Sequence, residues 1–109
     1  MGPRSILYGG RLITSGIKTA PTGTAERISS VSIPCRTLVV ISDSGGNAAN
    51  ANSDVTISIG DSEITTAKPG IRPNQGFEFN GLADGTEDPF EYYCISGTAS
   101  QKLSWWAYG

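Results

Sequence analysis

The chain has 109 residues, 14 of them glycine and 6 proline, which suits one domain with a core of its own. Abundant Gly, Ser, Thr and Asn predict short strands joined by turns and almost no helix. The formal net charge is only −2, and the basic residues are too scattered to form a nucleic-acid-binding face. No apolar run is long enough for a signal peptide or a bilayer span, so we expect a soluble protein made in the cytoplasm, without a membrane partner.

Residues 1–25 differ from the rest of the chain. Short apolar pieces alternate there with Gly, Thr, Ser and Pro, which predicts an extended arm or an edge hairpin. Residues 1–36 contain five basic residues and one acid, whereas residues 37–109 contain three basic residues and nine acids. We therefore expect a slightly cationic arm, residues 1–25, and a β-sandwich domain, residues 26–109. The arm is either solvated or docked on an acidic neighbour.

The first half of this domain contains three strand signals. Apolar and polar residues alternate over 31–35, where Pro34 marks an edge or a bulge. The segment 37–42, TLVVIS, is almost continuously apolar, as in a strand buried on both faces. A polar loop, 43–54, then leads into the strand 55–59, in which every second residue is apolar.

The second half completes the set of strands. The Gly-Asp pair at 60–61 predicts a tight hairpin, and residues 68–76 a longer corner. The segment 77–79, FEF, begins another strand, and alternation returns over 90–94 and 102–108. Seven or eight strands at intervals of roughly ten residues predict an all-β fold. We expect an antiparallel β-sandwich, jelly-roll-like or immunoglobulin-like, with an extended N-terminal arm.

The two cysteines raise the question of an immunoglobulin domain. Asp88 lies six residues before Cys94 and Tyr92 two residues before it, a spacing found in immunoglobulin variable domains. However, no tryptophan precedes Trp105, and that family packs one against its disulfide soon after the first cysteine. Alternation places Cys35 and Cys94 in the core. Two reduced thiols are favoured, because cytosolic disulfides rarely persist, and a disulfide remains the alternative.

The residues of catalytic and metal sites are mostly missing. The chain has no histidine, and no serine lies in a Gly-x-Ser-x-Gly elbow. Asp43 with Asp54, and Asp84 with Glu87 and Asp88, offer oxygen ligands for calcium, but neither group has the spacing of an EF-hand. Polar turns are the favoured interpretation of these acids. We expect no enzyme activity and no cofactor.

The last strand predicts a protein interface. Alternation places Trp105 in the core and Trp106 and Tyr108 on the opposite face, with Tyr93 across from them. Either the arm folds back over these rings or another subunit covers them, and tryptophan and tyrosine favour the subunit. The predicted interface combines an aromatic patch with a docking arm. Its residues are Arg4, Leu7, Tyr8, Arg11, Tyr93, Trp106 and Tyr108.

Four segments follow one another in an order that resembles a known group: IPCRTLVVIS, NSDVTISIGD, GIRPNQGFEF and FEYYCISGTASQKLSWWAY. A Pro-Cys-Arg step opens an inner strand, an Asn-rich loop leads into an alternating strand, and a GI-x-x-x-x-G corner precedes the next strand. In these features the chain is similar to the small β-sandwich structural proteins of tailed bacteriophages. The resemblance covers residues 30–108 and departs at 74–76, where Asn-Gln-Gly stands in place of the expected Pro-Gly.

The resemblance implies a non-enzymatic structural protein of the virion, assembled in the host cytoplasm and placed on the capsid surface. It would decorate or cement the capsid by binding the major capsid protein and its own copies, as a homo-oligomer with a trimer favoured. The alternative is a tail or fibre adhesion module that contacts the host surface through loops such as 43–54.

Overall fold

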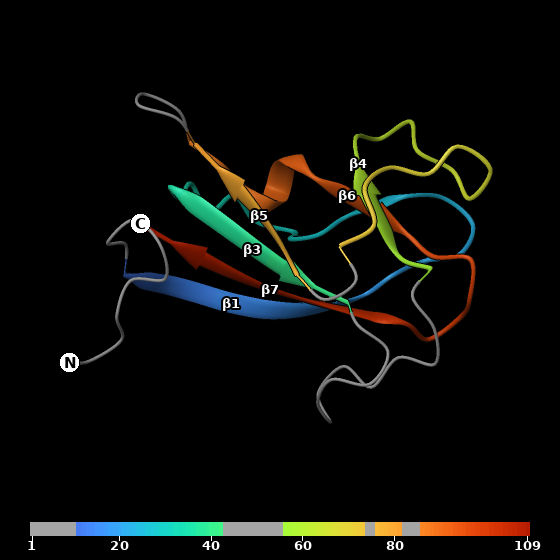
Figure 1. Ribbon diagram of the computed structural model, residues 1–109, viewed down its shortest axis with the longest axis horizontal. Coiled ribbons are helices and arrows are strands. Elements are labelled where there is room, and N and C mark those ends of the chain that lie inside the picture. Colours follow the sequence, from blue (N-terminus) through green and yellow to red (C-terminus); the bar gives the residue numbers. More distant parts are fainter. Residues whose placement is uncertain (1–10, 43–55, 74–75, 82–85) are drawn as a thin grey trace.

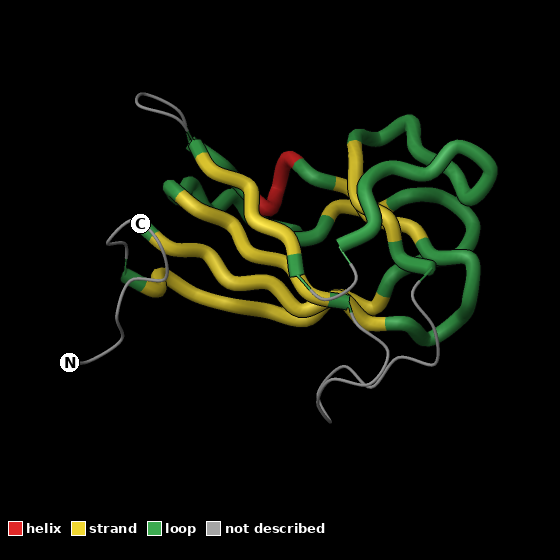
Figure 2. The backbone as a smooth tube through the Cα atoms, viewed as in Figure 1, coloured by secondary structure: helices red, strands yellow, loops and turns green. Residues whose placement is uncertain are grey.

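The computed structural model describes residues 11–42, 56–73, 76–81 and 86–109. This part of the chain contains seven strands in two antiparallel sheets, of four and three strands, and the expected all-β fold is confirmed (Figure 1). Apart from the strands, Figure 2 shows turns and loops and one short helical turn. Over the described residues, no helix has the length and apolarity needed to cross a membrane.

The larger sheet contains the first and last described strands as neighbours. Its strand order is β1 (Leu12–Thr19), β7 (Lys102–Tyr108), β3 (Thr37–Ile41) and β5 (Phe77–Asn80), and all its pairs are antiparallel. These four strands lie side by side in Figure 1. Strand β7 pairs on one side with β1 and on the other with β3, so the C-terminal strand is central to the sheet.

The smaller sheet is built from short strands. Its order is β2 (Glu26–Arg27), β6 (Tyr93–Ile95) and β4 (Ser58–Gly60). Both pairs are antiparallel, and isolated bridges join Ile59 to Ile71 and Cys35 to Glu87. The segment 61–73 therefore returns to the edge of β4 after leaving it.

The core lies between the two sheets and follows from strand alternation. Leu103, Trp105 and Ala107 of β7 point into it, and Leu38 and Val40 of β3 lie beside them. The smaller sheet adds further buried side chains. Together with the segments that flank the sheets, it supplies six buried apolar or thiol side chains: Ala20, Ile28, Cys35, Ile57, Ile59 and Cys94. Ile33 is partly buried against this cluster.

Residues 12–19, which fall within the expected arm, form β1 and pair with β7 along the edge of the larger sheet. The register shifts between Leu12 and Thr14, as in a β-bulge. Residues 1–10 lie outside the described residues.

Three local expectations were wrong. The alternation over 31–35 does not form a strand, and within this segment Cys35 makes only an isolated bridge, with Glu87. The Gly-Asp pair at 60–61 does not make a tight hairpin, because the Asp61 carboxylate accepts the Glu63 N–H at 2.8 Å and starts a wider loop. The strand expected over 90–94 begins only at Tyr93. Before it, Pro89–Glu91 form a 3-10 turn, η2, because the Asp88 side chain caps the Phe90 N–H.

One glycine is required where β1 meets β7. Gly16 lies opposite Trp105 in the register, and the indole ring occupies the space beside its Cα. A Cβ atom at Gly16 would come within 2.7 Å of the ring. The absent side chain therefore lets Trp105 lie in the core with 6% of its surface exposed.

Gly16→Ala should lower the free energy of unfolding by about 1–3 kcal/mol, since the added methyl group overpacks a rigid indole ring. Urea unfolding monitored by tryptophan fluorescence measures this loss. Gly23→Ala is the matched control, because no atom lies within 4 Å of its Cβ position, and it should stay within about 0.5 kcal/mol of the parent. Equal stability of Gly16→Ala and the parent would contradict the packing described for Trp105.

Candidate docking face

The outer face of the four-stranded sheet, the side turned away from the core, is rich in apolar side chains. On β7, the alternation that buries Leu103 and Trp105 places Trp106 and Tyr108 on this outer side, where both are half-buried. On β3, Leu38 and Val40 are fully buried, whereas Val39 is only half-buried. We expected both faces of this strand to be buried. Only the inner face is fully buried, and Val39 and Ile41 on the outer face are half-buried.

The strand register arranges the outer side chains in rows across the sheet. Trp106 lies between Ser15 of β1 and Val39 of β3, and Tyr108 lies between Leu12 and Thr37. A third row joins Ile17, Ser104 and Ile41. We call the apolar members of these rows the outer apolar face: Leu12, Ile17, Val39, Ile41, Trp106 and Tyr108.

The exposure of this face identifies it as a candidate docking surface. Leu12 is 43% exposed and Ile17 is 53% exposed, although both are large apolar residues on a regular strand. They flank half-buried aromatic rings on the neighbouring strand. An apolar cluster with Trp and Tyr at its centre has the composition of a protein interface more than that of a solvated sheet face.

The structure brings together some of the predicted interface residues. Arg11 is exposed, and its backbone forms two hydrogen bonds with Gly109, of 3.1 and 2.8 Å, which places it next to Tyr108. Trp106 and Tyr108 lie on the same strand face. The other three arm positions, Arg4, Leu7 and Tyr8, lie outside the described residues.

Tyr93 is not part of this surface, because it belongs to β6 in the other sheet. Its ring faces the Arg27 guanidinium, with 4.9 Å between the guanidinium carbon and the ring centroid. The same guanidinium lies 4.0 Å from the centroid of Phe90 and donates a hydrogen bond to the Phe90 carbonyl. Tyr93 thus helps to hold a cation–π cluster on the smaller sheet.

Sequence reasoning missed four members of the outer apolar face. The sequence pattern predicts an arm for Leu12 and Ile17, and a strand covered on both sides for Val39 and Ile41. The sequence does contain a strand signal here, the spaced apolar residues of LITSGIKT. A bulge near Ile13 shifts the alternation by one position, so Leu12 and Ile17 lie on the same face of β1. Without the register, these residues cannot be placed next to Trp106.

Both cysteines are buried and free of any disulfide. Burial, with the nearby charges of Asp88 and Glu87, raises the pKa of Cys35 to about 11. Burial also raises the pKa of Cys94 to about 12. Both thiols are therefore protonated near neutral pH, and they pack as small apolar side chains in the core, not as nucleophiles.

The stretch DPFEYYC, which resembled an immunoglobulin strand, has a different role in this fold. The Asp88 carboxylate accepts hydrogen bonds from the Ser32 hydroxyl, from the Ile33 N–H at 2.8 Å and from the Phe90 N–H at 2.9 Å. Partial burial opposes the ionisation of Asp88, but these three bonds outweigh it and lower its pKa. Asp88 therefore ties the segment before β3 to the turn before β6.

Tyr92 has a comparable structural role. Its hydroxyl donates to the Glu87 carboxylate at 2.5 Å, and its ring lies 4.4 Å from that of Phe79, measured between centroids. Burial raises the pKa of the Tyr92 hydroxyl, and the hydrogen bond to Glu87 adds to the effect. Glu87 and Asp88 are thus occupied by protein partners, and the described residues contain no group of three potential metal-ligating side chains.

The thiols should react with a disulfide reagent at pH 8 roughly a hundredfold more slowly than unfolded cysteine, because their raised pKa values leave little thiolate. Absorbance at 412 nm, with and without urea, measures both rates. An intact mass that is the same with and without reductant would agree with two free thiols. Rapid modification of the folded protein, or a mass change on reduction, would contradict the description of this core.

The protein should lose stability as pH falls below about 4, because a carboxylate with a lowered pKa contributes its stabilisation above its unfolded pKa and loses it on protonation. Asp88→Asn should flatten this part of the pH profile. Asp88→Ala should cost about 1–2 kcal/mol at pH 7 through the lost cap. Chemical unfolding between pH 2 and 7 provides the measurement, with Asp61→Asn as an exposed control. The same acid slope in Asp88→Asn and the parent would contradict the role of Asp88.

Comparison with known proteins gives no family and no function for this chain. The chain matches no protein-family model, no curated protein and no solved structure. The resemblance to tailed-phage structural proteins therefore stays an expectation from sequence patterns. A functional proposal has to rest on the candidate docking face.

Proposed function

We propose that this protein is a non-enzymatic structural subunit that attaches to a larger assembly through its outer apolar face. The observation that carries the proposal is the position of Trp106 and Tyr108 beside exposed Leu12 on one side of a regular sheet. Burying such side chains contributes about 25 cal/mol for each Å² of apolar surface removed from water. Attachment through this face would therefore gain free energy without any chemical step.

The chemistry of the described side chains supports binding over catalysis. The two thiols are buried and protonated, the chain has no histidine, and the half-buried acid Glu87 accepts a hydrogen bond from Tyr92. The aromatic rings of the outer apolar face, by contrast, are placed where a partner can reach them. Tryptophan and tyrosine are the residues that most often anchor protein interfaces.

The resemblance to structural proteins of tailed bacteriophages suggests which assembly the protein joins. The protein would decorate or cement the capsid of a tailed bacteriophage, bound to the major capsid protein and to its own copies. On a repeating lattice, many modest contacts of this kind combine into persistent attachment. The proposed docking arm includes Arg11, whose backbone pairs with Gly109 beside Tyr108. Arm residues would extend the contact area beyond the sheet.

Trp106→Ser should weaken binding to capsids stripped of auxiliary subunits at least tenfold, since it removes the central ring of the face. The variant should lose less free energy of unfolding than the about 3–5 kcal/mol lost when a fully buried tryptophan is truncated, because Trp106 is only half-buried. Cosedimentation with capsids measures binding, and urea unfolding measures stability. Val31→Ser is the matched control: Val31 is 59% exposed, lies outside the face, and its variant should bind like the parent.

Three outcomes would count against the proposal. Binding to host cells and not to capsids would favour the tail or fibre adhesion module. Unfolding of the isolated Trp106→Ser variant would assign the ring to the core of the subunit. Unchanged capsid binding by a folded Trp106→Ser variant would show that another surface makes the contact.

A further inference from the structure

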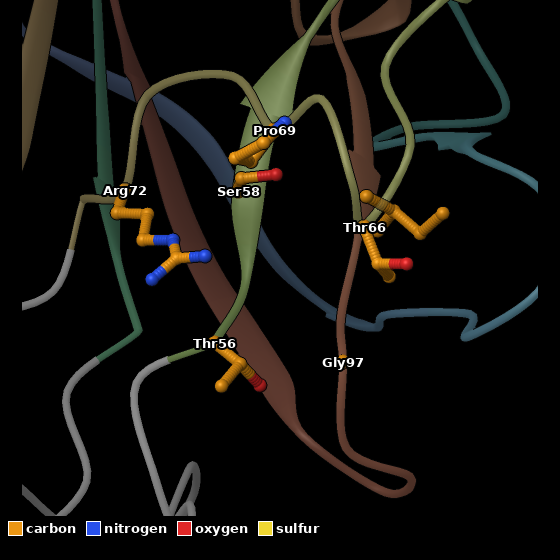
Figure 3. A pocket seen from close by; sticks show the side chains of 7 residues that line it. Thr56, Ser58, Thr66, Pro69, Arg72 and Gly97 are labelled. Atoms are coloured by element: carbon orange, nitrogen blue, oxygen red, sulfur yellow. The ribbon is translucent and has the colours of Figure 1, made fainter.

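A small pocket lies on the outer face of the three-stranded sheet, the opposite side of the sandwich from the outer apolar face. Thr56, Ser58, Ile95 and Gly97 form its floor on and beside β4 and β6, and part of the segment 61–73 covers it. The covering side chains are Thr66, Pro69 and Arg72. The cavity has a volume of about 70 Å³. Figure 3 shows the side chains that line it.

The segment that covers the pocket is held close to β4 by backbone contacts. Ile59 and Ile71 exchange two hydrogen bonds, of 2.7 and 2.8 Å. Gly70 approaches the strand so closely that a Cβ atom there would lie 2.0 Å from the Ile59 carbonyl oxygen. This approach places Arg72 beside the pocket, and Figure 3 shows its side chain extending toward the strand that carries Thr56 and Ser58.

Ser58 is the unusual residue of this pocket. It points away from the core, yet it is only 1% exposed, because the segment 61–73 covers it. Within the described residues, its hydroxyl oxygen has no hydrogen-bond partner. A buried polar atom without a partner costs about 1–3 kcal/mol, so such an atom in a pocket wall indicates a place for a bound molecule.

The charge of the pocket indicates what kind of molecule fits. Arg72 is the charged member of the described lining, which otherwise contains hydroxyl-bearing, apolar and glycine residues and no carboxylate. The guanidinium group offers paired N–H donors that match the oxygens of carboxylate and phosphate groups. The Ser58 hydroxyl can donate to the same oxygen atoms.

The size of the pocket limits the ligand to a few heavy atoms. A volume of about 70 Å³ is less than half that of an engineered protein cavity that holds benzene, about 150 Å³. A group of a few heavy atoms therefore fits this pocket better than a sugar or a nucleotide base does. We propose that the pocket between β4 and the segment 61–73 binds a small oxyanion, held by the Arg72 guanidinium and the Ser58 hydroxyl. The group is a carboxylate or a tetrahedral anion such as phosphate or sulfate.

Titration of the full chain, labelled with ¹⁵N, tests this assignment by NMR. Sodium acetate, sodium phosphate and sodium sulfate are added in separate arms, each against sodium chloride at the same ionic strength. At least one oxyanion should produce saturable shifts at the amides of Ser58 and Arg72, and chloride should not. Selectivity for acetate would identify a carboxylate site, and selectivity for phosphate or sulfate a tetrahedral-anion site.

Two variants and a control separate the pocket from general salt effects. Arg72→Gln should weaken binding about tenfold or more, because it removes a charge-assisted hydrogen bond. Ser58→Ala should weaken it to a similar extent and adds no bulk, which keeps the test valid if Arg72→Gln fails to fold. Arg36→Gln removes an exposed charge outside the pocket and should leave affinity unchanged. The absence of saturable shifts with all three oxyanions, or equal affinity in Ser58→Ala and the parent, would overturn the proposal.

Discussion

The fold depends on the insertion of the C-terminal strand between two strands from the first half of the chain. β7 pairs with β1 and with β3, and on its inner side Trp105 packs over Gly16. This arrangement joins β1 to the rest of the larger sheet and places Trp105 in the core. Both partners of β7 are distant from it in sequence, so forming these pairs costs loop-closure entropy. The burial of apolar side chains in the core has to offset that cost.

The same strand produces the surface proposed for binding. Period-two alternation gives β7 an inner series that includes Trp105 and an outer series that includes Trp106 and Tyr108. The first series stabilises the folded chain, and the second lies among apolar residues of β1 and β3. Adjacent residues thus serve stability and the proposed binding, and a substitution can affect one without the other. A shift of the register by one residue would exchange the two roles.

The strands of the smaller sheet are short, and side chains and loops hold this sheet in place. Asp88 fastens the segment before β3 to the turn before β6, and Arg27 packs on Phe90 and Tyr93. The segment 61–73 folds back on β4 and buries Ser58. Polar and charged residues such as Asp88 and Arg27, which are typical of loops in the sequence, therefore make contacts between distant parts of the chain. The proposed oxyanion pocket is a product of this closure, at the far side of the molecule from the outer apolar face.

Local patterns in the sequence were sufficient for the all-β class, for the burial of Cys94 and for the opposite faces of Trp105 and Trp106, because strand alternation has a fixed period of two. The burial of Cys35 was also expected, but it arises outside a regular strand, next to the bridge with Glu87. Local patterns were insufficient for the separation of Tyr93 from Trp106, for the place of Leu12 and Ile17 beside that ring and for the pocket at Ser58. Those features depend on which strands pair and on how a loop returns to its sheet. Pairing and loop return are decided by contacts between residues distant in the chain, and only the tertiary structure contains them.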